Sequence, residues 1–199
     1  MTMCNENWPD TWLNPPQKLE ELEGGGYRIT TGAATDFFND PTGSHMKQNG
    51  HLWYKEVSGD FIVRACIRPQ FGHVWDAGCV MVRKDANIWA KLCYERTDFG
   101  PDAIVSVVTK NVSDDANGVE ITAEAVHLQI VRKGNVFAMH YAPDDVNWQM
   151  VRIFSLDVAK DEPLQVGINS QCPGGESTTI DVLSFAIIPG SIDNMRAGK

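Results

Sequence analysis

Short runs of alternating apolar and polar residues recur along the chain, and each run is closed by a turn signal. In the run 61–68, apolar side chains alternate with Arg64 and Arg68, so they share one face of a predicted strand. Ser58-Gly59-Asp60 forms the turn before this run, and Pro69 ends it. The same pattern predicts further strands at 26–30, 51–56, 75–83, 88–95, 103–109, 126–132, 136–141, 150–155, 164–169 and 179–188.

The connections between these runs favour an antiparallel arrangement. A polar turn at 84–87 and the turn Arg132-Lys133-Gly134-Asn135 each separate two runs, so each pair is predicted to form a hairpin. A helix of two turns is expected over 17–23, and the glycines at 24–26 end it. Because helical segments of crossover length are lacking, the sequence predicts an all-β antiparallel sandwich in a single domain over residues 1–199.

Composition and charge exclude several classes of protein. A chain of 199 residues that is 43% hydrophobic can bury the core of one domain. Its net charge of −9 argues against a nucleic acid or an anionic membrane as partner. No run approaches the roughly 20 apolar residues of a membrane-spanning helix. Residues 1–13 lack the basic and apolar regions of a secretory signal, so a cytoplasmic protein is expected.

The cysteines and histidines predict neither a metal centre nor a cofactor. The five cysteines, Cys4 among them, are widely spaced without a Cys-x-x-Cys pair, which argues against a disulfide framework or a zinc ribbon. Cys66, Cys79 and Cys93 lie inside apolar runs and are predicted to be buried. The histidines form no zinc motif, and the oxygen-rich segments 114–118 and 144–145 are interpreted as turns rather than calcium loops.

A series of short motifs runs through the chain in a fixed order. They are Thr35-Asp36-Phe37-Phe38, Gly59-Asp60-Phe61, Trp75-Asp76-Ala77-Gly78, Trp89-Ala90-Lys91, Glu95, Ser106-Val107-Val108-Thr109, Ser113-Asp114, Arg132-Lys133-Gly134-Asn135, Trp148, Val151-Arg152 and Val166-Gly167-Ile168. Over residues 8–188 this order resembles an uncharacterised family with a concanavalin A-like jelly-roll fold, which includes the fungal regulation-of-enolase proteins. Similar modules occur at the C-termini of some bacterial β-xylosidases.

This resemblance implies a sandwich of two curved antiparallel sheets, whose concave face is where members of the superfamily bind or cleave sugars. Three positions depart from the family pattern. Phe38 and Asp115 stand where tryptophan is common, and Cys172-Pro173-Gly174 replaces a Ser-Pro-Gly run. The resemblance carries no specific reaction with it.

One predicted strand concentrates candidate binding groups. Trp89, Lys91 and Glu95 alternate along 88–95 and therefore share a face. Asp76, on the partner strand of the same hairpin, is expected near Lys91. This cluster is either a ladder of cross-strand ion pairs on a solvated sheet face or the polar lining of a ligand groove.

A ligand-binding site is predicted from these residues and from other aromatic and polar positions. In it, Trp53 and Trp89 stack a sugar ring, and polar side chains bind its hydroxyl groups. For each tryptophan and histidine the alternative is plain structural packing. The predicted site comprises Trp53, Arg64, Asp76, Trp89, Lys91, Glu95 and His140.

Three functional hypotheses remain open at this stage. The leading one is a non-catalytic, lectin-like sandwich that binds a glycan or small molecule or, from the resemblance, regulates an intracellular metabolic enzyme. The second is a carbohydrate-active or isomerase-type enzyme with Glu95 or Asp76 as acid/base, although the Glu-x-Asp-x-x-Glu strand of related glucanases is absent. The third is a protein-interaction scaffold that binds through a sheet edge or apolar patch.

Overall fold

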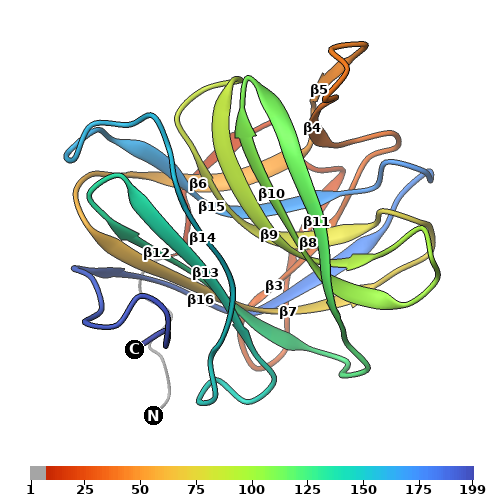
Figure 1. The fold of residues 1–199 in the computed structure, drawn as a ribbon. Coiled ribbons are helices and arrows are strands. Elements are labelled where there is room, and N and C mark those ends of the chain that lie inside the picture. The colour runs from red at the N-terminus through yellow and green to blue at the C-terminus, as the bar shows by residue number, and fades with distance from the viewer. Residues whose placement is uncertain (1–7) are drawn as a thin grey trace.

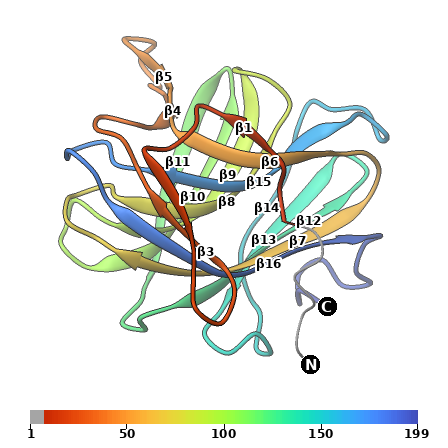
Figure 2. The same ribbon diagram turned by 180° about the vertical axis from the view of Figure 1, so that it is seen from behind.

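The computed structural model describes residues 8–199, which form two large antiparallel sheets packed face to face (Figure 1). Sheet A has the strand order β1 (Thr11–Leu13), β6 (His51–Val57), β15 (Leu164–Gln171), β8 (Ala77–Arg83), β9 (Ile88–Arg96), β10 (Asp102–Lys110) and β11 (Val112–Glu120). Sheet B has the order β14 (Gln149–Ser155), β13 (Val136–Ala142), β12 (Val126–Lys133), β7 (Phe61–Gln70), β16 (Thr179–Pro189), β3 (Tyr27–Thr30) and β2 (Lys18–Glu21). A separate small hairpin pairs β4 (Phe37–Asn39) with β5 (Met46–Gln48) and projects beside the end of sheet A (Figure 2).

The predicted antiparallel sandwich is confirmed, and each predicted strand appears with its ends within two residues of the expected ones. The hairpins β8–β9 and β12–β13 are both present. The helix expected over 17–23 is wrong, because this segment forms β2 and pairs with β3 in register Lys18↔Thr30. The turn expected at 114–118 is also wrong, because those residues lie within β11 and pair with β10.

Alternation along β9 divides its side chains between two apolar layers. Leu92 and Tyr94 join the main core between the sheets, together with Ile130 and Phe137 of sheet B. Trp89 and Cys93 join a smaller cluster on the opposite face of sheet A, the face that points away from sheet B. We call this the outer face of sheet A.

The predicted burial of three cysteines is confirmed. Cys66, Cys79 and Cys93 are all buried in the strands that carry them, and Cys172 is buried as well. Cys4 lies outside the described residues. Within residues 8–199, no helix is long and apolar enough to cross a membrane.

A buried carboxylate ties three neighbouring strands of sheet B together. Asp181 of β16 is fully buried and lies directly opposite Arg28 of β3 and Arg68 of β7. Arg28 Nε donates to Asp181 Oδ1 at 2.6 Å, and Arg68 Nη2 donates to Asp181 Oδ2 at 2.8 Å. Burial acts to raise the pKa of Asp181, but the hydrogen bonds from the two arginines outweigh it and hold this pKa below its ordinary value.

Replacing this carboxylate is expected to weaken the fold in a pH-dependent way. Asp181→Asn should lower the free energy of unfolding by about 1.5–3 kcal/mol at neutral pH, since the two arginines lose the charge that strengthens their hydrogen bonds. A carboxyl whose pKa is lower in the folded state stabilises above its ordinary pKa, and this stabilisation is lost as pH falls through the folded value. Urea unfolding between pH 3 and 7 measures this effect, with the exposed Asp193→Asn as control. Equal stability of both variants at neutral pH would contradict the assignment.

Candidate functional site

A pocket of about 340 Å³ opens on the outer face of sheet A. Its floor consists of side chains from three neighbouring strands, because Lys91 of β9, Val107 of β10 and Asp115 of β11 lie directly opposite one another in the register. Gln171, the last residue of β15, and Asp36, just before β4, complete the polar lining. The pocket lies in the 300–1,000 Å³ range of small-molecule sites.

Lys91 is a buried ammonium group at the base of this pocket. Its side chain is 2% exposed. The Nζ atom donates to Gln171 Oε1 at 2.7 Å and to Asp36 Oδ1 at 3.1 Å. Burial acts to lower the pKa of Lys91, but attraction to Asp36 outweighs it, so the pKa lies above its ordinary value. Lys91 is therefore a fixed positive charge that Asp36 neutralises.

Glu95 is a neutral carboxyl group at ordinary pH. Glu95 is 7% exposed. Burial raises its pKa to about 8, Lys91 opposes this, and the acidic groups of Asp115 and Asp36 add to the increase. Burial also raises the pKa of Asp115. A protonated Glu95 offers a hydroxyl donor to the pocket, whereas an ionised carboxylate accepts only.

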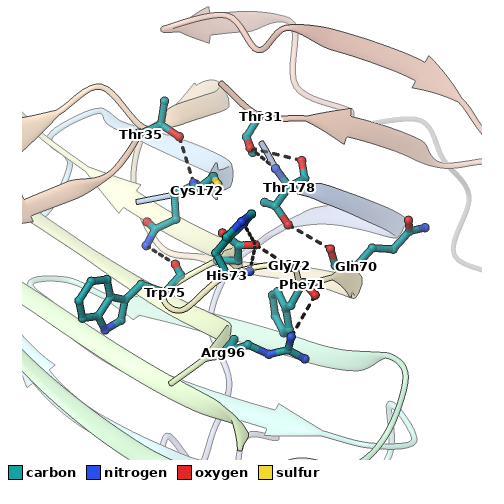
Figure 3. Close-up of polar contacts among 12 residues, drawn as sticks. Thr31, Thr35, Gln70, Phe71, Gly72, His73, Trp75, Arg96, Cys172 and Thr178 are labelled. Carbon is teal, nitrogen blue, oxygen red and sulfur yellow. Dashed lines mark hydrogen bonds and ion pairs between the residues drawn. The ribbon is translucent and has the colours of Figure 1, made fainter. Parts of the chain in front are cut away.

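Trp75 places an exposed indole at the rim of the pocket. The residue is 48% exposed and has a left-handed backbone conformation with φ of 67°. A backbone hydrogen bond from Trp75 N to Arg96 O, at 2.7 Å, holds this turn against the end of β9. Gln171 Nε2 donates to Trp75 O at 3.4 Å, which links the same turn to β15 (Figure 3). A non-glycine residue with positive φ indicates a position fixed by its surroundings.

The structure brings two of the predicted site residues, Lys91 and Glu95, into the pocket. Trp89 lies on the same strand face but is fully buried, with its ring centroid 5.8 Å from Lys91 Nζ. It lies beside Lys91 and, being fully buried, presents no free face for stacking. Asp76 is not among the lining residues, since its Oδ2 accepts hydrogen bonds from the backbone N–H groups of Gly72 and His73. The expected cluster of Asp76 with Lys91 and Glu95 is therefore corrected.

Three other predicted residues lie elsewhere in the fold. Trp53 is buried on the core-facing side of β6, where it stacks on Trp12 with ring centroids 5.3 Å apart. Arg64 Nε donates to Gln129 Oε1 at 2.6 Å, and Gln129 also contacts His140 at 3.2 Å. Arg64, Gln129 and His140 lie on β7, β12 and β13 of sheet B. The prediction that Trp53, Arg64 and His140 share a groove with Lys91 is therefore wrong.

The surroundings of His140 indicate a structural role. It is fully buried, and its Nε2 lies 2.8 Å from Met195 O of the C-terminal segment. Burial lowers the pKa of His140, so the ring is neutral at ordinary pH. A satisfied, enclosed histidine of this kind fixes the C-terminal segment against sheet B.

The other lining residues were not in the predicted site, and the polar or aromatic ones among them include Asp36, Trp75, Asp115 and Gln171. Asp36, Trp75 and Asp115 fall in or beside the motifs that carry the family resemblance, which is the signal that could have found them. Gln171 ends a predicted strand and carries no such signal.

A second group of potential ligand atoms lies behind Trp75. His73, Asp76 and Cys172 place a ring nitrogen, a carboxylate oxygen and a sulfur within 4.8 Å of one another. Among residues 8–199 this is the group whose donor atoms suit a metal ion.

Comparison with known proteins gives both family and fold. The family described as "Protein of unknown function (DUF1349)" matches residues 12–189. The Regulation of enolase protein 1 of Saccharomyces cerevisiae is 26% identical over 144 residues, which is 72% of each chain. A crystal structure of a functionally unknown Saccharomyces cerevisiae protein superposes with a TM-score of 0.82 and 22% identity, covering 91% of this chain and 97% of that one.

Bacterial carbohydrate-active proteins share the fold at lower identity. A carbohydrate-binding module, CBM66 of Bacillus subtilis, has a TM-score of 0.56 and 15% identity, and the match covers 90% of this chain and 96% of the module. A xylan β-1,4-xylosidase of Bacillus halodurans has a TM-score of 0.64 and 15% identity over 82% of this chain and 33% of the enzyme. With its family model matched over most of its length, the chain belongs to the DUF1349 family.

Proposed function

We propose that the protein is a non-catalytic recognition module that binds a neutral sugar in the pocket on the outer face of sheet A. The observation that carries this proposal is the exposed indole of Trp75 beside the buried polar groups of Lys91 and Glu95. A pyranose ring has apolar C–H faces that stack on an indole, and hydroxyl groups that need donors and acceptors at its edge.

The charge balance of the pocket favours a neutral ligand. Lys91 is paired with Asp36, and the lining contains one further lysine, Lys47, and one further aspartate, Asp115. Glu95 is uncharged at neutral pH. A site for phosphate or an acidic sugar would present cations without neutralising partners, because an anion has to gain more from the site than it loses in hydration.

The donors and acceptors of the pocket suit hydroxyl groups. An ammonium group has three N–H donors, and two acceptors contact Lys91 here. The protonated carboxyl of Glu95 adds an O–H donor, and the Asp115 carboxyl oxygens accept. The shared fold of CBM66, whose name describes it as a carbohydrate-binding module, supports the same ligand class.

Removing the rim indole is expected to weaken sugar binding without unfolding the chain. Trp75→Ala should weaken affinity by at least about tenfold, since aromatic stacking contributes about 0.5–1.5 kcal/mol beyond the apolar area that the ring buries. Calorimetric titration with a panel of neutral mono- and oligosaccharides measures this loss. Phe99→Ala is the matched control, because Phe99 is an aromatic side chain 81% exposed that is not among the pocket-lining residues. Unchanged affinity of Trp75→Ala for a bound sugar would refute the site.

Regulation of a metabolic enzyme is the second candidate function. Its support is the 26% identity to a protein named Regulation of enolase protein 1. If the protein regulates enolase, we expect it to form a complex with purified enolase, and analytical ultracentrifugation detects such a complex directly. A complex that persists in Trp75→Ala assigns the partner to another surface, whereas its loss assigns the partner to the pocket.

Catalysis is a third outcome that the same panel tests. The expected acid and base, Glu95 and Asp76, are not assembled in the pocket, where the remaining carboxyl groups are Asp36 and Asp115. Products released from any sugar of the panel, and lost on Glu95→Gln, would replace the binding proposal with an enzymatic one.

A further inference from the structure

We propose that His73, Asp76 and Cys172 form a zinc-binding site directly behind the wall of the pocket. The three residues come from two loops that are distant in the sequence. His73 and Asp76 lie in the connection between β7 and β8, and Cys172 follows β15. Figure 3 shows His73 and Cys172 on neighbouring segments, with Trp75 beside them.

The geometry of the three side chains supports a common ion. One ligand atom from each residue lies within 4.8 Å of the other two. His73 Nδ1 is 3.9 Å from Asp76 Oδ2. Ligands of a tetrahedral zinc ion are about 3.3–3.6 Å apart, given bond lengths of about 2.0–2.3 Å. Closing the site from these separations requires rotation of the half-exposed His73 ring and a small movement of its loop.

A buried oxygen without a partner points to the same conclusion. Asp76 is fully buried, and its Oδ2 accepts hydrogen bonds from two backbone N–H groups, at 2.9 and 3.0 Å. Its Oδ1 is buried and has no hydrogen-bond partner among residues 8–199. A buried carboxylate oxygen that lacks a partner is costly, and a metal ion satisfies it.

The loop that carries Cys172 is shaped to receive the imidazole. A Cβ atom on Gly175 would lie 2.1 Å from His73 Nδ1 and 2.6 Å from its Cε1. Only glycine therefore lets the His73 ring lie against this loop. Cys172 N donates to Thr35 Oγ1 at 3.0 Å, which fixes the cysteine from its other side.

Thiolate, imidazole and carboxylate together are typical of zinc. Zinc accepts sulfur, nitrogen and oxygen ligands, whereas calcium and magnesium take oxygen alone. Three protein ligands leave a fourth position for water. Binding of Zn²⁺ to the Cys172 thiol forms the Zn–S bond and releases the thiol proton to solvent.

A metal ion at this position would link the two loops that wall the pocket. Trp75 lies between His73 and Asp76 in the sequence, and Pro173 follows Cys172; both line the pocket. Zinc is thus expected to hold the rim indole in place and to strengthen ligand binding indirectly. The metal site itself stands independently of the ligand that the pocket takes.

Metal titration of the full chain tests the proposal. After treatment with chelator, the protein is titrated with Zn²⁺ by calorimetry and with Co²⁺ by absorption spectroscopy. We expect one ion per chain and a near-ultraviolet band from thiolate-to-cobalt charge transfer. Cys172→Ser should remove the band, and His73→Ala should weaken Zn²⁺ binding by at least about tenfold, since even changes beyond the direct ligands cost 10- to 100-fold.

Matched variants separate this site from adventitious binding. Cys66→Ser and His127→Ala change another buried cysteine and another histidine, and both should bind Zn²⁺ like the unaltered protein. His73 is half exposed, so His73→Ala keeps the test decisive even where Cys172→Ser fails to fold. Absence of stoichiometric Zn²⁺ binding, or binding unaffected by His73→Ala, overturns the proposal. Neither result refutes sugar binding by the pocket, which is measured separately.

Discussion

Replacing Arg132 with alanine is expected to lower the free energy of unfolding by about 3–5 kcal/mol. Arg132, at the end of β12, is fully buried between the rings of Phe61 and Phe137, each about 5.9 Å from its guanidinium carbon. The guanidinium donates to four backbone carbonyl groups, at distances of 2.7–2.9 Å: those of Gly134, Ala159, Lys160 and Glu162. Truncation leaves these acceptors without their donor and opens a cavity, and each unsatisfied acceptor costs about 1–3 kcal/mol before water relieves part of it.

Two companion variants make this measurement specific. Lys133→Ala changes the adjacent exposed residue and should alter the free energy of unfolding by less than about 0.5 kcal/mol. Arg132→Lys keeps the charge but lacks the planar fork, so it should retain only part of the stability. The values come from guanidinium chloride unfolding at fixed pH. A loss below 1 kcal/mol in Arg132→Ala would show that the loop 159–162 is not anchored by this side chain.

Replacing Glu95 with glutamine is expected to change how stability depends on pH. Burial raises the pKa of Glu95 to about 8 in the folded protein, from an ordinary value of 4.5. Between these values the unfolded chain releases the proton while the folded protein keeps it, so the free energy of unfolding falls as pH rises. Glutamine has no proton to lose. The stability of Glu95→Gln relative to the unaltered protein should therefore increase by about 1.4 kcal/mol per pH unit across this window.

Unfolding at pH 5, 6.5 and 8 measures this difference, with Glu56→Gln as the control for an exposed carboxyl group. Parallel pH profiles for Glu95→Gln and the unaltered protein would mean that Glu95 is ionised at neutral pH. The pocket would then carry an additional negative charge, and its preference for a neutral sugar through a carboxyl donor would lose its basis.

Strong alternation made most of the fold predictable. The runs that became β7, β9 and β12 have clear apolar faces, so their existence followed from the pattern. The turns predicted the hairpin partners of β9 and β12, whereas the pairing of β7 with β12 and β16 was not predicted. The helix predicted around Lys18–Glu21 was wrong because pairing with β3 holds its helix-favouring residues in an extended conformation. Local propensity does not include this tertiary effect. Strand β11 was missed because Ser113 to Gly118 is polar; this edge strand is held by its ladder to β10.

The candidate site was predictable only along a single strand. Lys91 and Glu95 were found because residues two apart on a strand share a face. Trp89 has the same spacing, yet the sequence does not show that the segment around Phe37 covers it. Trp53 and Arg64 were misplaced because alternation along a strand assigns side chains to two faces of the sheet but does not show which face carries the pocket. Cys172 lies about 100 residues from His73, so no motif spacing announced their proximity.

A crystal structure of the protein soaked with neutral mono- and oligosaccharides is the most direct test of sugar binding in this pocket. We expect a sugar ring against the indole of Trp75, with its hydroxyl groups within hydrogen-bond distance of Lys91, Glu95 or Asp115. A sugar bound on another face of the sandwich, or an empty pocket in crystals where calorimetry shows no binding of any member of the panel, would contradict it.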